Sequence, residues 1–414
     1  MTKDRLRVVV SGHEICGLIH DLAREFERRG HTVVTVAMPH RLYRYSYDFD
    51  QYNFLVSLLA RRFGLRVLWE RALQVLWEIR KEWHKALELK PRIRLARSAD
   101  LYVRIWGGIP FDREVLQAIE GGPTRVTTLL MGCDVRDHDV FRKEYVITHR
   151  TFPPVPWTFP LKVKLQNLRT HERYADAIFS VPDQMGLALR PYHHLHVPLH
   201  LEKFRYVVPG RAVPRVVHSP SVPQAKGTDI IEAALETLRG EGVAFELISV
   251  RDVPHEDLLS ILSDADVVVD QLIFHGPAWL SFEAMASGCA TATRYLEDSP
   301  ACFRPPVWGI NERNIVDRLR TLLTDRDLRL RLAEDGRSYV EAHNRIEHVV
   351  DRMLEKVEAG RGGVPDYVPT YLTTQYIPID DKEAATINAE TDLVSGETWY
   401  RDHVVGRTHD GLVF

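Results

Sequence analysis

The sequence predicts an α/β protein with two domains, each built on a doubly wound parallel β-sheet. Short apolar stretches alternate with helical segments of about ten residues, which is the spacing of βαβ units. The alternation occurs twice, so we assign one domain to residues 1–205 and a second to 206–358. The 414 residues suffice for two hydrophobic cores and leave a tail at 359–414 without recognisable chemistry.

The second domain shows the clearest alternation, between residues 215 and 293. Asp229 and Glu232 stand three residues apart at the start of an apolar pattern, which predicts a capping box. Gly240 and Gly288 follow helical segments and are expected to end them. The expected strands are 215–218, 243–250, 266–270 and 289–293, and the expected helices are 229–238, 255–262 and 280–286.

Lys226 and Glu283 follow ends of these strands and are candidate ligand-binding residues. Ligands of parallel α/β sheets bind at the carboxyl ends of the strands, so both side chains are expected at one crevice. A cation beside a helix N-terminus suits a phosphate, and a carboxylate nearby suits a ribose diol. Each such charge-assisted hydrogen bond is worth roughly 1.5–3 kcal/mol. The pair therefore predicts a nucleotide site.

The first domain opens with a strand, a glycine-containing loop from Gly12 to Gly17, and a helix. The loop matches neither the G-x-G-x-x-G pattern nor a Walker loop. Its glycines could let the backbone approach a phosphate, or could serve close packing of helix and strand. The expected strands are 6–11, 32–37, 99–106, 125–131 and 175–181, and the expected helices are 18–29 and 163–174.

Three segments of the second domain carry a family resemblance. They are His218-Ser-Pro-Ser-Val-Pro-Gln-Ala-Lys226-Gly-Thr, Ala265-Asp-Val-Val-Val-Asp-Gln271 and Phe282-Glu-Ala-Met-Ala-Ser-Gly288. In this order and spacing they resemble the donor-binding half of GT-B glycosyltransferases of the retaining family-4 type. The resemblance implies two Rossmann-like domains that face a cleft, and transfer of a sugar from a nucleotide-sugar.

The resemblance also implies roles for individual residues. Lys226 would bind the donor diphosphate and Glu283 the ribose. Asp134 and Arg136 match a family motif, His-Gly-Ser-Asp-x-Arg, that lies close to the sugar and the acceptor. The expected donor-binding residues are Gly12, Gly17, Ser221, Lys226, Gly227, Asp270, Gln271, Gly276 and Glu283. The expected catalytic residues are Asp134 and His275, and the expected acceptor-side residues are Asp134 and Arg136.

Three positions depart from the family pattern. Met131 stands where the motif has histidine, Ser221 where an arginine precedes the lysine, and His275 where a second glutamate binds the donor sugar. Ser221 removes one cation from the diphosphate site, which is worth roughly 1.5–3 kcal/mol of interaction. His275 could bind a sugar hydroxyl, assist departure of the phosphate when protonated, or fill space.

Composition argues against several other classes of protein. A net charge of −3 argues against a nucleic-acid partner, and no apolar run approaches the roughly 20 residues of a membrane span. The start of the chain has no signal-peptide pattern, and the four cysteines lack C-x-x-C spacing, so we expect free thiols in the cytoplasm. The sequence gives no oligomeric state.

Three further segments have a structural and a functional interpretation. The basic stretch at 61–85 is either one side of an amphipathic helix or a contact with an anionic membrane surface. Asp264-Ala-Asp266 mimics a metal-binding D-x-D motif but precedes a strand, so a turn is expected and no metal. The histidines at 193, 194, 196 and 200 lie in a proline-punctuated connection, which favours a surface or hinge role over a metal site.

The predicted function is therefore transfer of a sugar from a nucleotide-sugar donor to a small-molecule, glycan or lipid-linked acceptor, without cofactor or metal. Retention of configuration is implied by the resemblance alone. The alternative is a catalytically degraded GT-B protein that binds a nucleotide or a partner, which the departures at Met131, Ser221 and His275 favour. A third hypothesis, epimerisation of a nucleotide-sugar, has no acid–base set to support it.

Overall fold

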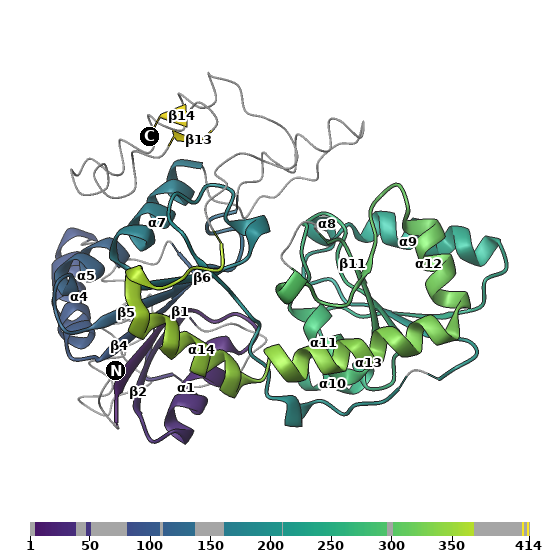
Figure 1. Ribbon diagram of the computed structural model, residues 1–414, viewed down its shortest axis with the longest axis horizontal. Helices are drawn as coiled ribbons and strands as arrows, with labels where there is room; N and C mark the ends of the chain where they lie inside the picture. The colour runs from purple at the N-terminus through teal and green to yellow at the C-terminus, as the bar shows by residue number, and fades with distance from the viewer. Residues whose placement is uncertain are drawn as a thin grey trace. The chain divides into compact units, whose positions relative to one another are not determined.

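The computed structural model describes residues 5–38, 47–50, 81–107, 111–136, 161–208, 210–295, 301–367, 408–409 and 412–413. The chain divides into two compact units, each with its own parallel sheet (Figure 1). Among the described residues, unit 1 holds 5–136, 161–195 and the segment after 349, and unit 2 holds 196–349. The units thus divide the chain at 195 and 349, where the sequence placed boundaries at 205 and 358.

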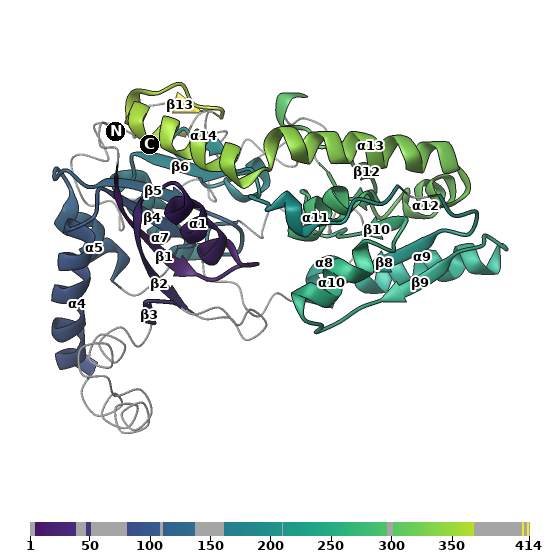
Figure 2. The same cartoon turned by 90° about the horizontal axis from the view of Figure 1, so that it is seen from below.

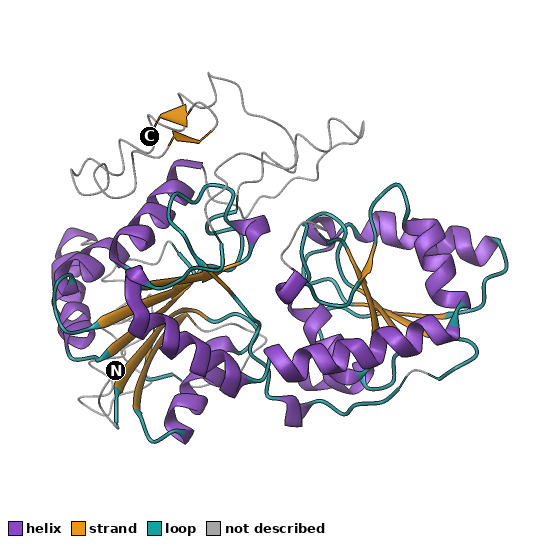
Figure 3. Cartoon of the chain, viewed as in Figure 1, coloured by secondary structure: helices purple, strands orange, loops and turns teal. Residues whose placement is uncertain are grey.

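Unit 1 is a seven-stranded parallel sheet in the order β3-β2-β1-β4-β5-β6-β7. Helices α1 and α14 lie on one side of the sheet, and α4, α5 and α7 on the other (Figure 3). The strands are β1 Arg7–His13, β2 Thr32–Met38, β3 Phe49–Asp50, β4 Leu101–Ile105, β5 Arg125–Leu129, β6 Ala177–Ser180 and β7 His193–His194. The helices are α1 Leu18–Arg28, α4 Lys81–Arg97, α5 Asp112–Ile119, α7 Leu161–Tyr174 and α14 Ile346–Ala359.

Unit 2 is a five-stranded parallel sheet in the order β12-β11-β10-β8-β9. Helices cover both faces of its central strands, so β10 and β11 are buried along their whole length and β8 is buried from Val216 to His218. Helices α9 and α12 pack on one face, and α10, α11 and α13 on the other (Figure 1); Figure 2 looks onto the latter face. The strands are β8 Arg215–His218, β9 Glu246–Ser249, β10 Val267–Val269, β11 Ala290–Thr293 and β12 Trp308–Gly309. The helices are α8 Pro223–Lys226, α9 Thr228–Gly240, α10 His255–Leu262, α11 Trp279–Ser287, α12 Ile315–Thr324 and α13 Arg326–His343.

Each sheet has a topological switch point. In unit 1 the chain runs from β1 outward to β2 and β3, and then continues from β4 on the other side of β1. In unit 2 it runs from β8 to β9 and then crosses to β10 on the other side of β8. Loops that leave adjacent strands toward opposite faces open a crevice between them, and ligands of such sheets bind there.

The predicted elements of the second domain are present, but the predicted capping box is wrong. Helix α10 and strand β8 have the predicted bounds. The N-cap of α9 is Gly227, with φ 74° and no side-chain cap, so Asp229 lies inside the first turn. The short helix α8 lies between the expected strand 215–218 and the expected helix 229–238, and leads through Gly227 directly into α9. A glycine at that junction supplies the left-handed conformation that a capping residue with a side chain would resist.

The four histidines were expected at the surface or at a hinge, and the surface position is wrong for two of them. His193 forms part of β7 and is 5% exposed, and His196 is 6% exposed. The segment after α14 packs on this strand: Tyr367 stacks on Tyr192 with ring centroids 4.9 Å apart, and its hydroxyl lies 2.6 Å from His194 Nδ1. The start of the tail is therefore an ordered part of unit 1. The rest of the predicted tail, apart from two short strands at 408–409 and 412–413, lies outside the described residues.

The predicted membrane contact at 61–85 lies almost wholly outside the described residues; the backbone at 81–85 belongs to α4. Across the described part of the chain, no helix is both long enough and apolar enough to span a membrane.

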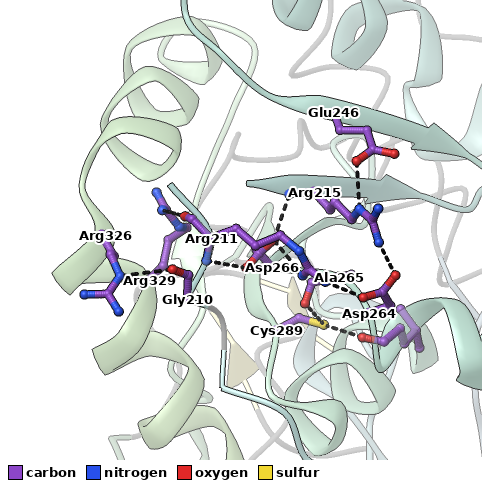
Figure 4. A network of polar contacts seen from close by, with 11 residues as sticks. Gly210, Arg211, Arg215, Glu246, Asp264, Ala265, Asp266, Cys289, Arg326 and Arg329 are labelled. Atoms are coloured by element: carbon purple, nitrogen blue, oxygen red, sulfur yellow. Dashed lines mark hydrogen bonds and ion pairs between the residues drawn. The ribbon is translucent and has the colours of Figure 1, made fainter. Parts of the chain in front are cut away.

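The Asp264-Ala-Asp266 motif is the predicted helix-to-strand turn, at the amino ends of β8 and β10. Asp266 is fully buried; its Oδ2 accepts from the backbone N–H of Arg215 at 2.8 Å and from the Arg211 guanidinium at 3.1 Å (Figure 4). Asp264 is exposed and pairs with both arginines. The motif thus links the amino ends of the neighbouring strands β8 and β10, opposite the carboxyl ends where the crevice lies. No group of His, Cys, Asp and Glu within the described residues has the arrangement of a metal site.

Replacing Asp266 with alanine is expected to destabilise unit 2 by roughly 2–4 kcal/mol, because a buried N–H and a charge-assisted bond lose their acceptor. Asp264→Ala is the matched control, since it removes exposed ion pairs of the same arginines worth at most about 1 kcal/mol. Urea unfolding of both variants measures the difference. Equal effects of the two substitutions would contradict the assignment of Asp266 as the fastening residue.

Candidate functional site

Lys226 lies at the switch point of unit 2. It ends α8, in the connection from β8 to α9, and its Nζ donates to Asp270 Oδ1 at 2.7 Å and to Gln271 Oε1 at 2.9 Å. Both acceptors directly follow β10, so this contact joins the loops of the two strands between which the crevice opens. The backbone supports it, because Leu272 N donates to Lys226 O at 2.9 Å.

The Lys226–Asp270 ion pair is largely removed from water, with 12% of the lysine side chain and none of the aspartate side chain exposed. A buried ion pair is stable only where further hydrogen bonds satisfy its remaining groups. Asp270 meets this condition, because its Oδ2 accepts from Ala278 N at 2.9 Å and from Ser281 Oγ at 2.6 Å, both at the start of α11. The carboxylate thus fixes the lysine and the helix that carries Glu283.

The ammonium group of Lys226 retains one N–H for a ligand. An ammonium has three donors, and two of them are bound to Asp270 and Gln271. Within the part of the chain that the structure describes, Lys226 makes no other polar side-chain contact. Asp270 already balances the charge of Lys226. A phosphate would therefore gain one directed hydrogen bond from the ammonium group and less electrostatic attraction than an unpaired lysine would provide.

Glu283 lies on α11 and is 4% exposed. Its Oε1 is 2.6 Å from Nε2 of His255, the first residue of α10, which follows β9. The turn before α10 contains Asp252 in the left-handed region, with φ 52°. His255 was absent from the sequence-based site. The only available signal was its place at the start of a helix after a strand end, which is too common to single it out.

His218 joins the same loops beneath the site. Its Nδ1 lies 2.8 Å from Val269 O, and its Nε2 lies 2.9 Å from Thr228 Oγ. Burial lowers the pKa of this imidazole, which favours the neutral form. A carbonyl can only accept, so Nδ1 carries the hydrogen and Nε2 accepts from the threonine hydroxyl. The resulting bridge fixes the end of β8 against β10 and α9.

The other predicted donor-side residues lie in the same loops with different surroundings. Ser221 is exposed in the loop after β8, and its side chain carries no charge that could bind a diphosphate. A Cβ at Gly227 would lie 3.1 Å from Leu272 Cβ and 3.2 Å from Ile273 Cδ1, so these side chains would have to shift, and the φ of 74° itself favours glycine. His275 is 2% exposed in the loop after β10, and Gly276 accepts from the Gln271 amide.

Gly12 lies at the switch point of unit 1, where β1 and β4 pack closely. A Cβ at Gly12 would lie 2.0 Å from Ile105 O of β4, so packing alone accounts for this glycine. Gly17 has φ 84° and is the N-cap of α1. The first turn of α1 is instead capped by Glu14, whose carboxylate accepts from Ile19 N and His20 N, each at 3.3 Å.

Asp134 is fully buried, and both carboxylate oxygens accept from backbone. Oδ2 accepts from Gly107 N after β4, and Oδ1 from Gly132 N after β5, each at 2.9 Å. Arg136 is buried and forms its ion pair with Asp183 at 3.1 Å. Asp134 therefore holds the turns after β4 and β5 at the carboxyl ends of the strands. Any influence of Asp134 on an acceptor would come from the position that it gives these two turns.

The sequence of unit 2 and the fold of both units match known proteins. Residues 228–355 match a family model described as glycosyl transferase-like. A trehalose-6-phosphate protein from E. coli bound with UDP-2-fluoro glucose is 12% identical, with a TM-score of 0.52 over 87% of this chain and 100% of that one. An α,α-trehalose-phosphate synthase from Burkholderia vietnamiensis is 11% identical, with a TM-score of 0.50 over 85% and 99%.

The chain has the GT-B fold. A third structure, of a trehalose-6-phosphate synthase studied for glycosyl transfer with retention, is 12% identical with a TM-score of 0.52 over 87% of this chain and 99% of that chain. No curated protein matches the sequence. The predicted fold class is therefore confirmed, and residues 228–355, most of which belong to unit 2, are similar in sequence to the glycosyl transferase-like family.

Burial raises the pKa of Asp134 to about 6, against the stabilising effect of two backbone N–H groups on the carboxylate. A carboxyl whose folded pKa lies above its unfolded value stabilises the fold at low pH. This contribution is complete below about pH 4 and is lost as the pH rises through about 6. Carboxyl ¹³C NMR should show one aspartate signal with a midpoint near 6, absent in Asp134→Asn. A midpoint near 4 would contradict the effect of burial.

Proposed function

We propose that this protein is a glycosyltransferase that transfers a sugar from a nucleotide-sugar donor to an acceptor. The observation that carries the proposal is the remaining N–H of Lys226 at the switch point of unit 2, with Glu283 on the adjoining helix α11. The family match over 228–355 includes Glu283, and two of the structural relatives are synthases of sugar phosphates.

In the proposed complex, the donor diphosphate accepts a hydrogen bond from Lys226, and the ribose binds Glu283. Asp270 holds the lysine in place before the ligand arrives, so little conformational entropy is lost on binding. Negative charge develops on the departing diphosphate in the transition state, where the fixed lysine N–H is more effective than a mobile one. Retention and independence of a metal are parts of this proposal.

A second candidate function is nucleotide binding without transfer. Ser221 supplies no cation, and the charge of Lys226 is already balanced by Asp270. Both features weaken stabilisation of a leaving diphosphate without preventing a nucleotide from binding. Turnover of the donor distinguishes this candidate from a transferase.

Thermal unfolding with UDP, GDP, dTDP, ADP and CMP tests the nucleotide site. A ligand at 100 times its dissociation constant adds about 2.7 kcal/mol of stability, so at least one nucleotide should raise the midpoint clearly. Glu283→Ala should abolish the shift, whereas Glu256→Ala, an exposed glutamate of α10, should leave it unchanged. No shift with any nucleotide would contradict both candidate functions.

Lys226→Gln should weaken binding of the selected nucleoside diphosphate about tenfold or more and leave binding of the nucleoside unchanged, because only the diphosphate contacts the lysine. Glutamine retains an amide donor toward Asp270, which limits damage to the fold. Isothermal titration measures both affinities. Release of nucleotide from the matching nucleotide-sugar, with a cell extract as the source of acceptors, then establishes transfer; binding without release favours the second candidate.

A further inference from the structure

We propose that His255 is the residue that positions Glu283 for a ribose hydroxyl and so makes the site selective for ribonucleotides over deoxyribonucleotides. This inference rests on the proposed function, because it concerns the nucleotide of the same site. It names a residue outside the three segments that carry the family resemblance. The contact between His255 Nε2 and Glu283 Oε1, at 2.6 Å, carries it.

The carboxylate of Glu283 is buried and needs a hydrogen-bond donor. Only 5% of its side chain is exposed, and a carboxylate so far removed from water is costly unless it is hydrogen-bonded or paired. Within the described residues, the only polar side-chain contact of this carboxylate is with His255, through Oε1. A carboxylate oxygen can only accept when ionised, so Nε2 is the donor. The contact therefore keeps Glu283 an acceptor.

The contact also fixes the orientation of the Glu283 carboxylate. With Oε1 held by His255, the rotation of the carboxylate is fixed, and Oε2 accepts no hydrogen bond from the described residues. Oε2 is not a buried atom: it belongs to the small part of the side chain that remains exposed. A hydroxyl that reaches the site meets an ionised oxygen in a fixed direction. Such charge-assisted acceptors bind hydroxyl donors strongly, and a ligand without the hydroxyl leaves them unsatisfied.

His255 and Glu283 are both held by rigid elements. His255 begins α10, after Pro254 at the N-cap, and Glu283 lies on α11. The two helices share a core, in which Leu258 and Leu259 pack on the cluster that contains Leu280. The imidazole and the carboxylate are therefore presented by two packed helices rather than by mobile loops. A site built in this way loses little entropy when a ligand binds.

The test compares a ribonucleotide with its deoxy analogues in four forms of the full chain. Dissociation constants of UDP, 2′-deoxyUDP and 3′-deoxyUDP, or of the guanosine set if GDP is selected, are measured by isothermal titration. The wild type should bind the ribonucleotide at least about tenfold more tightly than one deoxy analogue, the effect of one charge-assisted hydrogen bond. His255→Ala should reduce this ratio to about two or less.

Two conservative variants separate positioning from a merely structural role. The amide nitrogen of glutamine reaches as far along the side chain as Nε2, whereas that of asparagine reaches only as far as Nδ1. His255→Gln should therefore preserve the selectivity ratio, and His255→Asn should lose it. Midpoints of thermal unfolding without ligand establish that all variants are folded, and the selectivity ratio does not depend on their stability.

Each outcome decides between the inference and the function on which it rests. A wild type that binds the ribonucleotide, its 2′-deoxy analogue and its 3′-deoxy analogue equally overturns the inference and leaves the proposed function standing. Undiminished selectivity in His255→Ala also overturns it, because Glu283 would then act unaided. A wild type that binds no nucleotide overturns the proposed function together with the inference.

Discussion

The ion pair between Lys226 and Asp270 is the interaction on which the candidate site depends. It joins the loops of β8 and β10 at the switch point, and the same aspartate binds the first turn of α11. A charge pair of this kind would be unfavourable in the interior without the surrounding donors, so the loop conformations and the pair depend on each other. The position of Glu283 follows from this arrangement, since its helix begins at the residues that Asp270 holds.

The alternating pattern of the sequence predicted the architecture well, because short apolar stretches separated by helical segments of about ten residues are typical of βαβ units. β8 and α10 were predicted residue for residue, and Gly288, with φ 92°, ends α11 as expected. The capping box failed for a local reason. Asp229 and Glu232 have the right spacing, but the backbone enters the helix two residues earlier, at Gly227, and a spacing rule does not contain that information.

The site was predictable in part. Lys226 and Glu283 were selected from their places after strand ends, and Asp270 and Gln271 were among the expected donor-binding residues. The structure brings Lys226 into direct contact with Asp270 and Gln271. The pairing itself was not predictable, because strand order decides which loops are neighbours, and sequence gives only the order along the chain. His255 was missed for the same reason: its contact with Glu283 is made across 28 residues and two elements.

The two units differ in how their chain is distributed. The described residues of unit 2 come from one stretch, 196–349, whereas unit 1 needs residues from both ends. Arg29, the C-cap of α1, pairs with Asp351 of α14, and Asp366 accepts from His194 N of β7 at 2.8 Å. During synthesis from the N-terminus, unit 2 therefore has all of these residues available while unit 1 still lacks its closing helix. Unit 1 reaches these native contacts only after residues 350–367 have been synthesised, so unit 2 can complete its fold before unit 1 does.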